Sequence, residues 1–294
     1  MSMKIHFMVV RRVPAVPSPL LVEVARLLRA RGVQVDSSTA EELLQRPDRL
    51  APRHDVYVLK SHTELSLSVA GILHDQGARF LNPYPSCVTA QDKLVTARRL
   101  AAAGVPVPRS WTTADPRLLV PLLMQGPLVI KPHRGHRGAG VHIVHTAADI
   151  TAMPPATEPV IVQDYVPGTG EDLKVYVVGD HVAAVRKPFT ATSHAAPGRP
   201  CPVTDEVREI ALLAGRAFGL GLYGVDIIEG PAGPVVVDLN YFPGYKGLPD
   251  IAPLIADLVE DFARRRIDLE LPPFPATPTP GPGSGQDGPR ADAA

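Results

Sequence analysis

The stretch Gly224-Val-Asp-Ile-Ile228, followed by Val235-Val-Val-Asp-Leu-Asn240, predicts a β-hairpin. Both runs are rich in β-branched residues, and the segment between them contains the glycine and proline residues that favour turns. If the hairpin is centred near Ala232, Asp226 and Asp238 lie directly opposite each other, because each is equally far from the centre. Directly opposed side chains have Cβ atoms about 5 Å apart. The stretch therefore predicts two carboxylates facing each other across a hairpin.

The opposed carboxylates require a cation, because like charges directly opposite each other destabilise a strand pair. Asn240 lies on the same face as Asp238, since side chains along a strand repeat every second residue. Carboxylate and amide oxygens are hard ligands that suit Mg²⁺, which takes further ligands from nucleotide phosphates. Asp226, Asp238 and Asn240 are therefore predicted to bind magnesium, with manganese as an alternative ion. A different hairpin register, with both carboxylates on a solvated face, is the other interpretation.

A glycine-rich segment follows a predicted strand in the sequence Lys131-Pro-His-Arg-Gly-His-Arg-Gly-Ala-Gly-Val141. Its glycines, Gly135, Gly138 and Gly140, permit positive φ angles and let backbone N–H groups approach an anion closely. Lys131 would add positive charge beside the phosphate oxygens. The segment is not a Walker loop, because its lysine precedes the glycines. It predicts a phosphate-binding loop, with a simple glycine-rich hairpin turn as the alternative.

A turn follows the second strand of the carboxylate hairpin, in Asn240-Tyr-Phe-Pro-Gly-Tyr-Lys-Gly247. The Pro243-Gly244 step fits a tight turn. Backbone N–H groups of this turn and the ammonium group of Lys246 could contact an anionic substrate there. A purely structural turn is the alternative.

The first part of the chain alternates between predicted strands and helices. We expect strands at residues 4–10, 33–35, 55–59 and 79–81, helices at 20–31 and 65–76, and an acidic helix directly after Val35. This alternation is typical of an open parallel α/β sheet. Residues 1–85 are therefore predicted to form an N-terminal α/β domain.

Two further units and a tail are expected after residue 85. Residues 86–168 contain a predicted helix at 92–103 and the strands that flank the glycine-rich segment. Residues 169–270 contain a hairpin that turns at Gly179-Asp180, a helix at 204–218, the carboxylate hairpin and a last helix at 251–266. Residues 271–294 consist mainly of proline, glycine, alanine and small polar residues, which predicts a disordered tail.

The composition excludes several classes of protein. With 294 residues, of which 45% are hydrophobic, the chain can bury a core, so a disordered or fibrous protein is excluded. Thirty basic and thirty acidic side chains cancel and aromatic residues make up only 5%, so no nucleic-acid partner is expected. No apolar run approaches the roughly 20 residues that a membrane span needs. Two cysteines make no disulfide framework. We expect a cytoplasmic protein with no membrane partner, and the sequence leaves its oligomeric state open.

With lysine, glycine-rich loop, carboxylate hairpin and Pro-Gly turn in this order, residues 82–257 resemble the ATP-grasp superfamily. The resemblance implies an α/β fold of the α+β ATP-grasp type, in which an N-terminal open parallel α/β domain precedes two subdomains that clamp the nucleotide. It implies ATP and Mg²⁺ as cofactors. Most members are carboxylate–amine ligases that proceed through an acylphosphate.

The resemblance also implies roles for individual residues. Lys93 and Lys131 look like the lysines that contact the ATP phosphates, and Gly135, Gly138 and Gly140 look like the loop that covers them. The hinge that binds adenine would consist of Gln163, Asp164, Tyr165 and Val166. Lys174 and Arg186 stand where related proteins place cations near the γ-phosphate. Asp226, Asp238 and Asn240 match the metal-ligand triad.

Two subfamilies fit the motifs. The glycine-rich loop is similar to that of RimK-like ligases, whose acceptors are a carboxylate and the amine of an amino acid or peptide. Three other segments resemble inositol polyphosphate kinases, which phosphorylate a polyol phosphate: residues 55–60, 172–180 and 238–247. On the kinase interpretation, Lys60, His136, Gly244 and Lys246 are candidates for binding the acceptor. We take the ligase as the first hypothesis and the kinase as its alternative.

A non-catalytic nucleotide-binding protein is a third class. Such a protein is expected to lack at least one of the charged or metal-binding residues, and here all of them are present: Lys93, Lys131, Asp226, Asp238 and Asn240. The sequence therefore favours an active enzyme.

Overall fold

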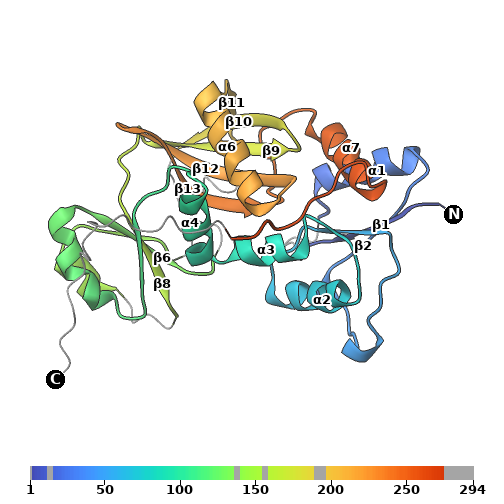
Figure 1. Ribbon diagram of the computed structural model, residues 1–294, viewed down its shortest axis with the longest axis horizontal. Coiled ribbons are helices and arrows are strands. Elements are labelled where there is room, and N and C mark those ends of the chain that lie inside the picture. Colours follow the sequence, from blue (N-terminus) through green and yellow to red (C-terminus); the bar gives the residue numbers. More distant parts are fainter. Residues whose placement is uncertain (1, 12–15, 136–139, 154–157, 189–196, 275–294) are drawn as a thin grey trace.

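The computed structural model describes residues 2–11, 16–135, 140–153, 158–188 and 197–274. It contains three β-sheets with helices packed against them (Figure 1). His136 and Gly138, and all but the first four residues of the predicted tail, lie outside the described residues.

The first sheet is parallel, as the alternating pattern predicted, with the strand order β2-β1-β3-β4. Its strands are β1 (Lys4–Met8), β2 (Gln34–Ser38), β3 (Val56–Leu59) and β4 (Phe80–Leu81), accompanied by helices α1 (Pro19–Ala30) and α2 (Glu64–Asp75). The prediction of an acidic helix after Val35 was wrong. Strand β2 continues to Ser38, and only two 3₁₀ turns follow, Ala40–Glu42 and Pro47–Arg49. Pro47 has no N–H to continue a helix, so it can only begin a new turn.

The second sheet is antiparallel and small, with the order β5-β8-β6-β7. It consists of β5 (Ser110–Thr113), β6 (Leu128–Pro132), β7 (His142–Val144) and β8 (Val160–Asp164), with a 3₁₀ segment Pro116–Gln125 and helix α5 (Ala147–Ala152). Helices α3 (Tyr84–Gln91) and α4 (Lys93–Ala102) precede it. Asp92 separates these two helices and caps α4, because its Oδ1 accepts from the backbone N–H groups of Leu94 and Val95. Helix α3 was not expected from the sequence.

The third sheet has the order β11-β10-β9-β12-β13 and carries the carboxylate hairpin. Its strands are β9 (Glu171–Val178), β10 (His181–Pro188), β11 (Arg199–Cys201), β12 (Leu222–Gly230) and β13 (Gly233–Tyr241). Helices α6 (Asp205–Phe218) and α7 (Ile251–Ala263) complete it. Both hairpins predicted in this part of the chain are confirmed.

The register of the carboxylate hairpin agrees with the prediction, since Asp226 pairs directly with Asp238. The turn, however, consists of residues 231–232, so its centre lies just before Ala232. Regular pairing from that turn would place Val237 opposite Asp226. A β-bulge makes Val237 an extra residue, and this restores the Asp226–Asp238 pair.

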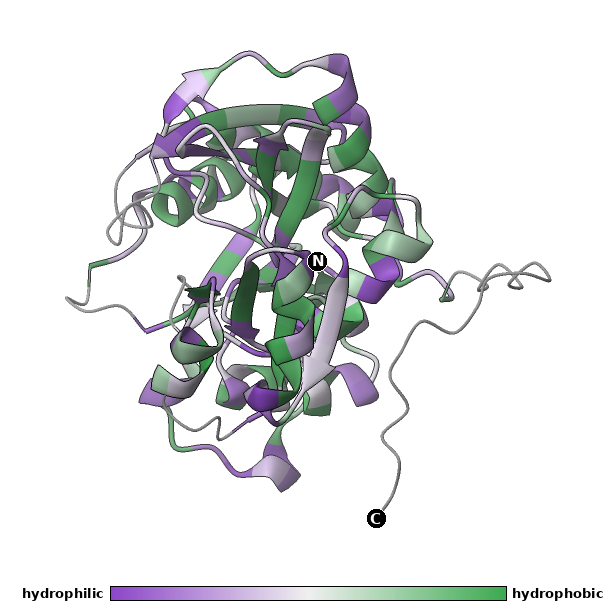
Figure 2. Ribbon diagram, turned by 90° about the vertical axis from the view of Figure 1, so that its left-hand side faces the viewer, coloured by the Kyte–Doolittle hydropathy of each residue, from purple (hydrophilic) through white to green (hydrophobic). Residues whose placement is uncertain are grey.

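Two hydrophobic cores hold the structure together. The larger core is continuous from the first sheet to the third sheet, whereas the second sheet has its own small core that includes Leu128, Ile130 and Val162. Hydrophobic residues concentrate on the strands and on the helix faces turned towards them (Figure 2). Asn82, fully buried, fastens the first sheet to β12, because its side chain donates to Leu222 O and accepts from the N–H groups of Gly221 and Leu222. The first and third sheets therefore pack as one body.

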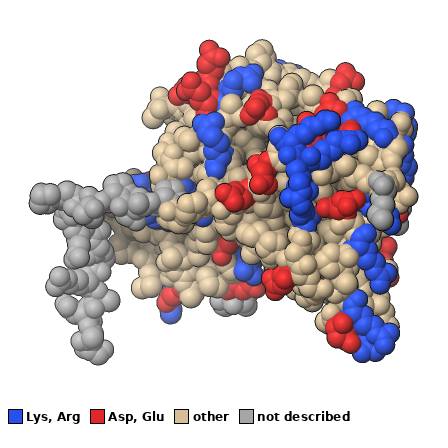
Figure 3. All heavy atoms as spheres, turned by 45° about the vertical axis from the view of Figure 1, so that its right-hand side comes forward, with Lys and Arg blue, Asp and Glu red and all other residues tan. Residues whose placement is uncertain are grey.

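The surface carries charges of both signs. Basic and acidic side chains lie interspersed over the face in Figure 3, in keeping with the zero net charge of the sequence. Within the described part of the chain, no helix is both long and apolar enough to cross a bilayer. Cys87 and Cys201 are both free thiols, as expected.

Gly215 offers a test of the packing between α6 and the third sheet. A Cβ at this position would lie 2.1 Å from the Oη of Tyr223, a buried side chain whose hydroxyl donates to Ala211 O. We expect Gly215→Ala to lower the free energy of unfolding by about 1–3 kcal/mol, because overpacking forces side chains and backbone to shift. Urea denaturation measures the change, with Arg208→Ala on the exposed face of the same helix as control. Equal stability of both variants would contradict this packing.

Candidate functional site

A cleft of about 1640 Å³ lies between the second and third sheets and extends to the first sheet. The second sheet lines it with the ends of β6 and β8, and the third sheet with residues of β9, β10, β12 and β13. All described candidate residues except Arg186 and Gly140 line this cleft. The lining candidates come from both sheets and from helix α4. Residues far apart in the sequence therefore meet at one place.

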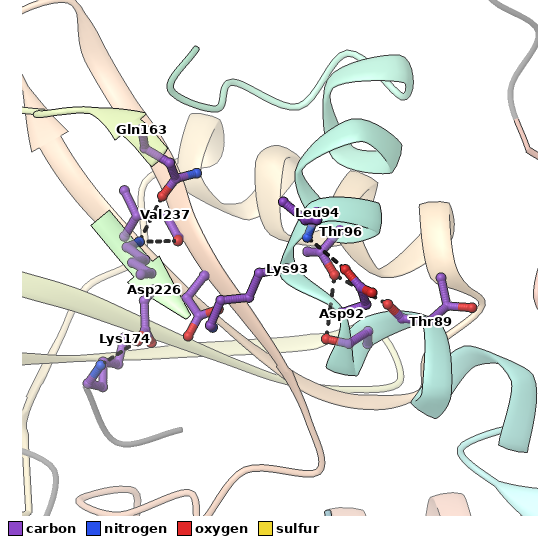
Figure 4. A network of polar contacts seen from close by, with 12 residues as sticks. Thr89, Asp92, Lys93, Leu94, Thr96, Gln163, Lys174, Asp226 and Val237 are labelled. Atoms are coloured by element: carbon purple, nitrogen blue, oxygen red, sulfur yellow. Dashed lines mark hydrogen bonds and ion pairs between the residues drawn. The ribbon is translucent and has the colours of Figure 1, made fainter. Parts of the chain in front are cut away.

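The opposed carboxylates on the floor of the cleft are each held by a lysine. Lys174 on β9 lies beside Asp226 in the sheet, and its Nζ is 2.7 Å from Asp226 Oδ2. Lys93 reaches in from the first turn of α4, and its Nζ is 2.5 Å from Asp238 Oδ1 (Figure 4). Asn240 also lines the cleft and is exposed. The two ammonium groups thus neutralise a carboxylate pair that would otherwise repel.

Lys131 lies half-buried beside this pair and is held by neutral oxygens. Its Nζ donates to Gln163 Oε1 at 2.8 Å and to the carbonyl oxygen of Val237 at 3.1 Å (Figure 4). The carbonyl belongs to the bulge residue, so the irregularity that sets the hairpin register also positions this lysine. Gln163 is buried, and its Nε2 donates to Ser110 Oγ.

The charges of these groups depend on one another. Burial would raise the pKa of Asp238, but the ammonium groups of Lys93 and Lys131 hold that pKa below its usual value. Burial raises the pKa of Asp226, against the opposing effect of Lys174. Burial lowers the pKa of Lys131. Burial also disfavours the charge of Lys174, yet the carboxylate of Asp226 raises its pKa above the usual value. Neither sign of charge is stable here without the other.

The donor set of the carboxylate pair fits a hard divalent cation. Asp226 and Asp238 face each other, and Asn240 adds an amide oxygen on the same side of β13. The side chains that partner the two carboxylates are those of lysines, whose ammonium groups a cation could replace. Among the described residues, no group of three His, Cys, Asp or Glu side chains forms a metal site by itself. Asn240 or ligands from a bound phosphate would therefore complete the coordination.

The hinge and the glycine-rich loop border the cleft from the second sheet. Asp164, Tyr165 and Val166 line it, as does Gly135. The backbone N–H groups of Asp164 and Tyr165 donate to Arg109 O and Pro127 O. Gly140 has a φ of +71°, and a Cβ there would lie 2.8 Å from Pro132 Cγ, so only glycine fits this close approach.

The far end of the cleft, towards the first sheet, is lined by Lys60, Gly244 and Lys246. The Nζ of Lys60 donates to Phe242 O at 2.6 Å and lies over the ring of that phenylalanine. Phe242 and Tyr245 both have positive φ angles, which bend the chain after β13 back towards the cleft. Lys60, which follows β3 of the first sheet, and Lys246, which follows β13 of the third sheet, therefore lie at the same end of the cleft.

The structure does not bring Arg186 to the other candidates. In the β9–β10 pairing Arg186 lies opposite Leu173 on the core-facing side of the sheet, and its guanidinium pairs with Glu229. The adjacent Lys187 lies opposite Asp172, on the face of Lys174, and lines the cleft. Because alternate residues of a strand face opposite sides, a shift of one position exchanges the two cations.

Lys187 and Asp172 are therefore site residues that the sequence interpretation missed. The signal was present in the hairpin that turns at Gly179-Asp180. Counting outward from this two-residue turn places residue 185 opposite Lys174 and residue 187 opposite residue 172.

Known proteins resemble this chain in sequence. A model of the RimK-like ATP-grasp domain family matches residues 90–257. The probable alpha-L-glutamate ligase of Xanthomonas oryzae pv. oryzae (strain MAFF 311018) is 31% identical over 228 residues, which cover 71% of this chain and 77% of that protein.

Solved structures resemble it in fold. A RimK domain ATP-grasp protein from Sphaerobacter thermophilus DSM 20745 superposes with a TM-score of 0.69 at 19% identity, covering 87% of this chain and 99% of that one. D-cycloserine synthetase DcsG gives a TM-score of 0.67 at 18% identity, with coverages of 89% and 99%. The chain therefore shares its fold with these solved structures.

The positions of Lys187 and Arg186 lead to a direct comparison of two variants. We expect Lys187→Ala to lower kcat/KM by about 100-fold or more, because removal of a positioned charge from a reaction site has an effect of this size. Arg186→Ala should leave kcat/KM close to that of the wild type, since its guanidinium faces away from the cleft. Steady-state ADP release measures both. A larger loss of kcat/KM in Arg186→Ala than in Lys187→Ala would show that Arg186, and not Lys187, acts in the site.

Proposed function

Because this chain belongs to the RimK-like ATP-grasp family and is an enzyme that forms C–N bonds with ATP, we propose that it activates a carboxylate as an acylphosphate for attack by the amine of an amino acid or peptide. The observation that carries the proposal is the set of lysines, from α4, β6, β9 and β10, around one opposed pair of carboxylates. The kinase alternative has no support among the relatives reported above.

The lysines would bind and orient the triphosphate. Lys131 reaches the cleft from the second sheet and Lys93 from helix α4, whereas Lys174 and Lys187 rise from its floor on the third sheet. An attacking carboxylate oxygen and the γ-phosphate are both anionic, so they can approach each other only where positive charge is concentrated. Closure of the glycine-rich loop would exclude water, which otherwise competes with the amine.

Asp226, Asp238 and Asn240 would hold a divalent cation, magnesium or manganese. When bound, such a cation neutralises phosphate charge and polarises the phosphoryl group. The chain's own contribution is to present two carboxylates at a fixed separation, set by the strand pairing and the bulge.

The hinge would bind the adenine through its backbone. Since the N–H groups of Asp164 and Tyr165 already have partners, Val166 is our candidate for the N–H donor. Gln163 would act differently from its neighbours, because its buried side chain holds Lys131.

The acceptor would bind at the end of the cleft formed by Lys60, Gly244 and Lys246, where cationic side chains suit a carboxylate. The Xanthomonas relative is described as a glutamate ligase. We therefore propose an amino acid or peptide as the acceptor and a cytoplasmic location for the reaction.

The reaction class can be tested by measuring ADP and free phosphate from Mg-ATP with two acceptor panels. One panel contains amino acids and peptides, and the other contains inositol phosphates and sugar phosphates. We expect ADP and free phosphate in equal amounts, dependent on both a carboxylate and an amine. ADP without free phosphate, together with a phosphorylated acceptor, would instead support the kinase.

The site itself can be tested with Lys131→Ala and Asp238→Ala. Each should reduce ATP turnover by at least about 100-fold, because each removes a charge placed at the reacting phosphates. Circular dichroism and thermal unfolding establish that the variants remain folded. Turnover like that of the wild type in either folded variant would refute the proposed site.

A further inference from the structure

Lys174 is shared between two carboxylates. Its Nζ lies 2.7 Å from Asp226 Oδ2 and 2.8 Å from Asp172 Oδ2. Asp172 and Lys174 are on the same face of β9, since they are two residues apart. Of the two carboxylates, only Asp226 belongs to the pair that we propose as the cation site.

Asp172 is buried, unlike the carboxylates of the ion pairs on the surface. Only 8% of the residue is exposed, and its second oxygen, Oδ1, is buried without a hydrogen-bond partner among the described residues. Leaving a buried carboxylate oxygen unpaired costs free energy, so stability alone does not explain its presence.

A divalent cation at Asp226 must compete with the ammonium group of Lys174. If Asp226 were the only carboxylate beside Lys174, cation binding would leave this mostly buried ammonium group without a counter-charge from the chain until a phosphate reaches it, which is unfavourable. Asp172 removes this penalty, because Lys174 keeps one carboxylate after Asp226 has turned to the cation.

We propose that Asp172 is a positioning residue that holds Lys174 in the cleft when Asp226 binds the divalent cation, and that it thereby sets the affinity for that cation. The proposal rests on the proposed function of the site. Asp172 acts through Lys174 and is not itself a ligand, so its effect must depend on Lys174.

A double-mutant cycle tests this dependence. Mg²⁺ is titrated at a fixed concentration of AMPPNP, and nucleotide binding is followed by calorimetry and by the rise in Tm. Asp172→Asn, which keeps the shape and removes the charge, should raise the Mg²⁺ concentration at half-saturation by on the order of tenfold. In the Lys174→Met background, the same substitution should change it by less than about twofold.

Glu171→Gln is the matched control. Glu171 is the neighbouring residue on β9, and its carboxylate pairs with Arg199 at 3.6 Å on the surface. This variant should leave the half-saturation concentration unchanged.

Three results would overturn the proposal. An Asp172→Asn variant that is less stable but has a normal Mg²⁺ dependence would show a merely structural role. A full effect of Asp172→Asn in the Lys174→Met background would make Asp172 a direct ligand. AMPPNP binding by the wild type that does not depend on Mg²⁺ would overturn the proposed function as well, which distinguishes that failure from the first two.

Discussion

The repulsion between Asp226 and Asp238 is the constraint on which the rest of the site depends. Two carboxylates directly opposite each other in a mostly buried hairpin are unstable unless positive charge surrounds them. The chain supplies it from separate elements, Lys93 from α4 and Lys174 from β9. On the proposed function, a site assembled in this way would be arranged for the charges of a nucleotide triphosphate and its cation before either binds, since the same lysines could turn from carboxylate to phosphate.

The division of the hydrophobic core explains how these elements are positioned. The first and third sheets share one core, which Asn82 fastens across the fold, and so the carboxylate hairpin and the far end of the cleft belong to one body. The second sheet has a core of its own and presents Lys131 and the hinge from the opposite wall. Binding between two separately packed bodies allows the walls to adjust to a ligand without disturbing either core.

Irregular features of the backbone position the site residues as much as the regular strand pairing does. The bulge at Val237 both restores the opposition of the two carboxylates and turns its carbonyl oxygen to Lys131. Gln163, at the start of the segment that we propose as the hinge, uses its side chain for the same lysine. A neutral pair of acceptors holds Lys131 without neutralising it, so its charge remains available for an anion.

The opposition of Asp226 to Asp238 was predicted from a hairpin centre at Ala232, and it depends on the bulge at Val237. Sequence patterns alone determined most of the elements and the family: the parallel alternation of the first sheet and the two hairpins of the third. These follow from local periodicity and from counting outward from turns, which need no knowledge of distant residues. Tertiary structure alone decided which face of β10 lines the cleft and what each charge contacts. Arg186 and Lys187 are adjacent in sequence and lie on opposite faces of β10, and only the packing of the sheets sets the face of Lys187 against the cleft. The pairing of Lys93 with Asp238 joins residues that are 145 positions apart in the chain, a contact that depends on tertiary packing and that no local pattern encodes.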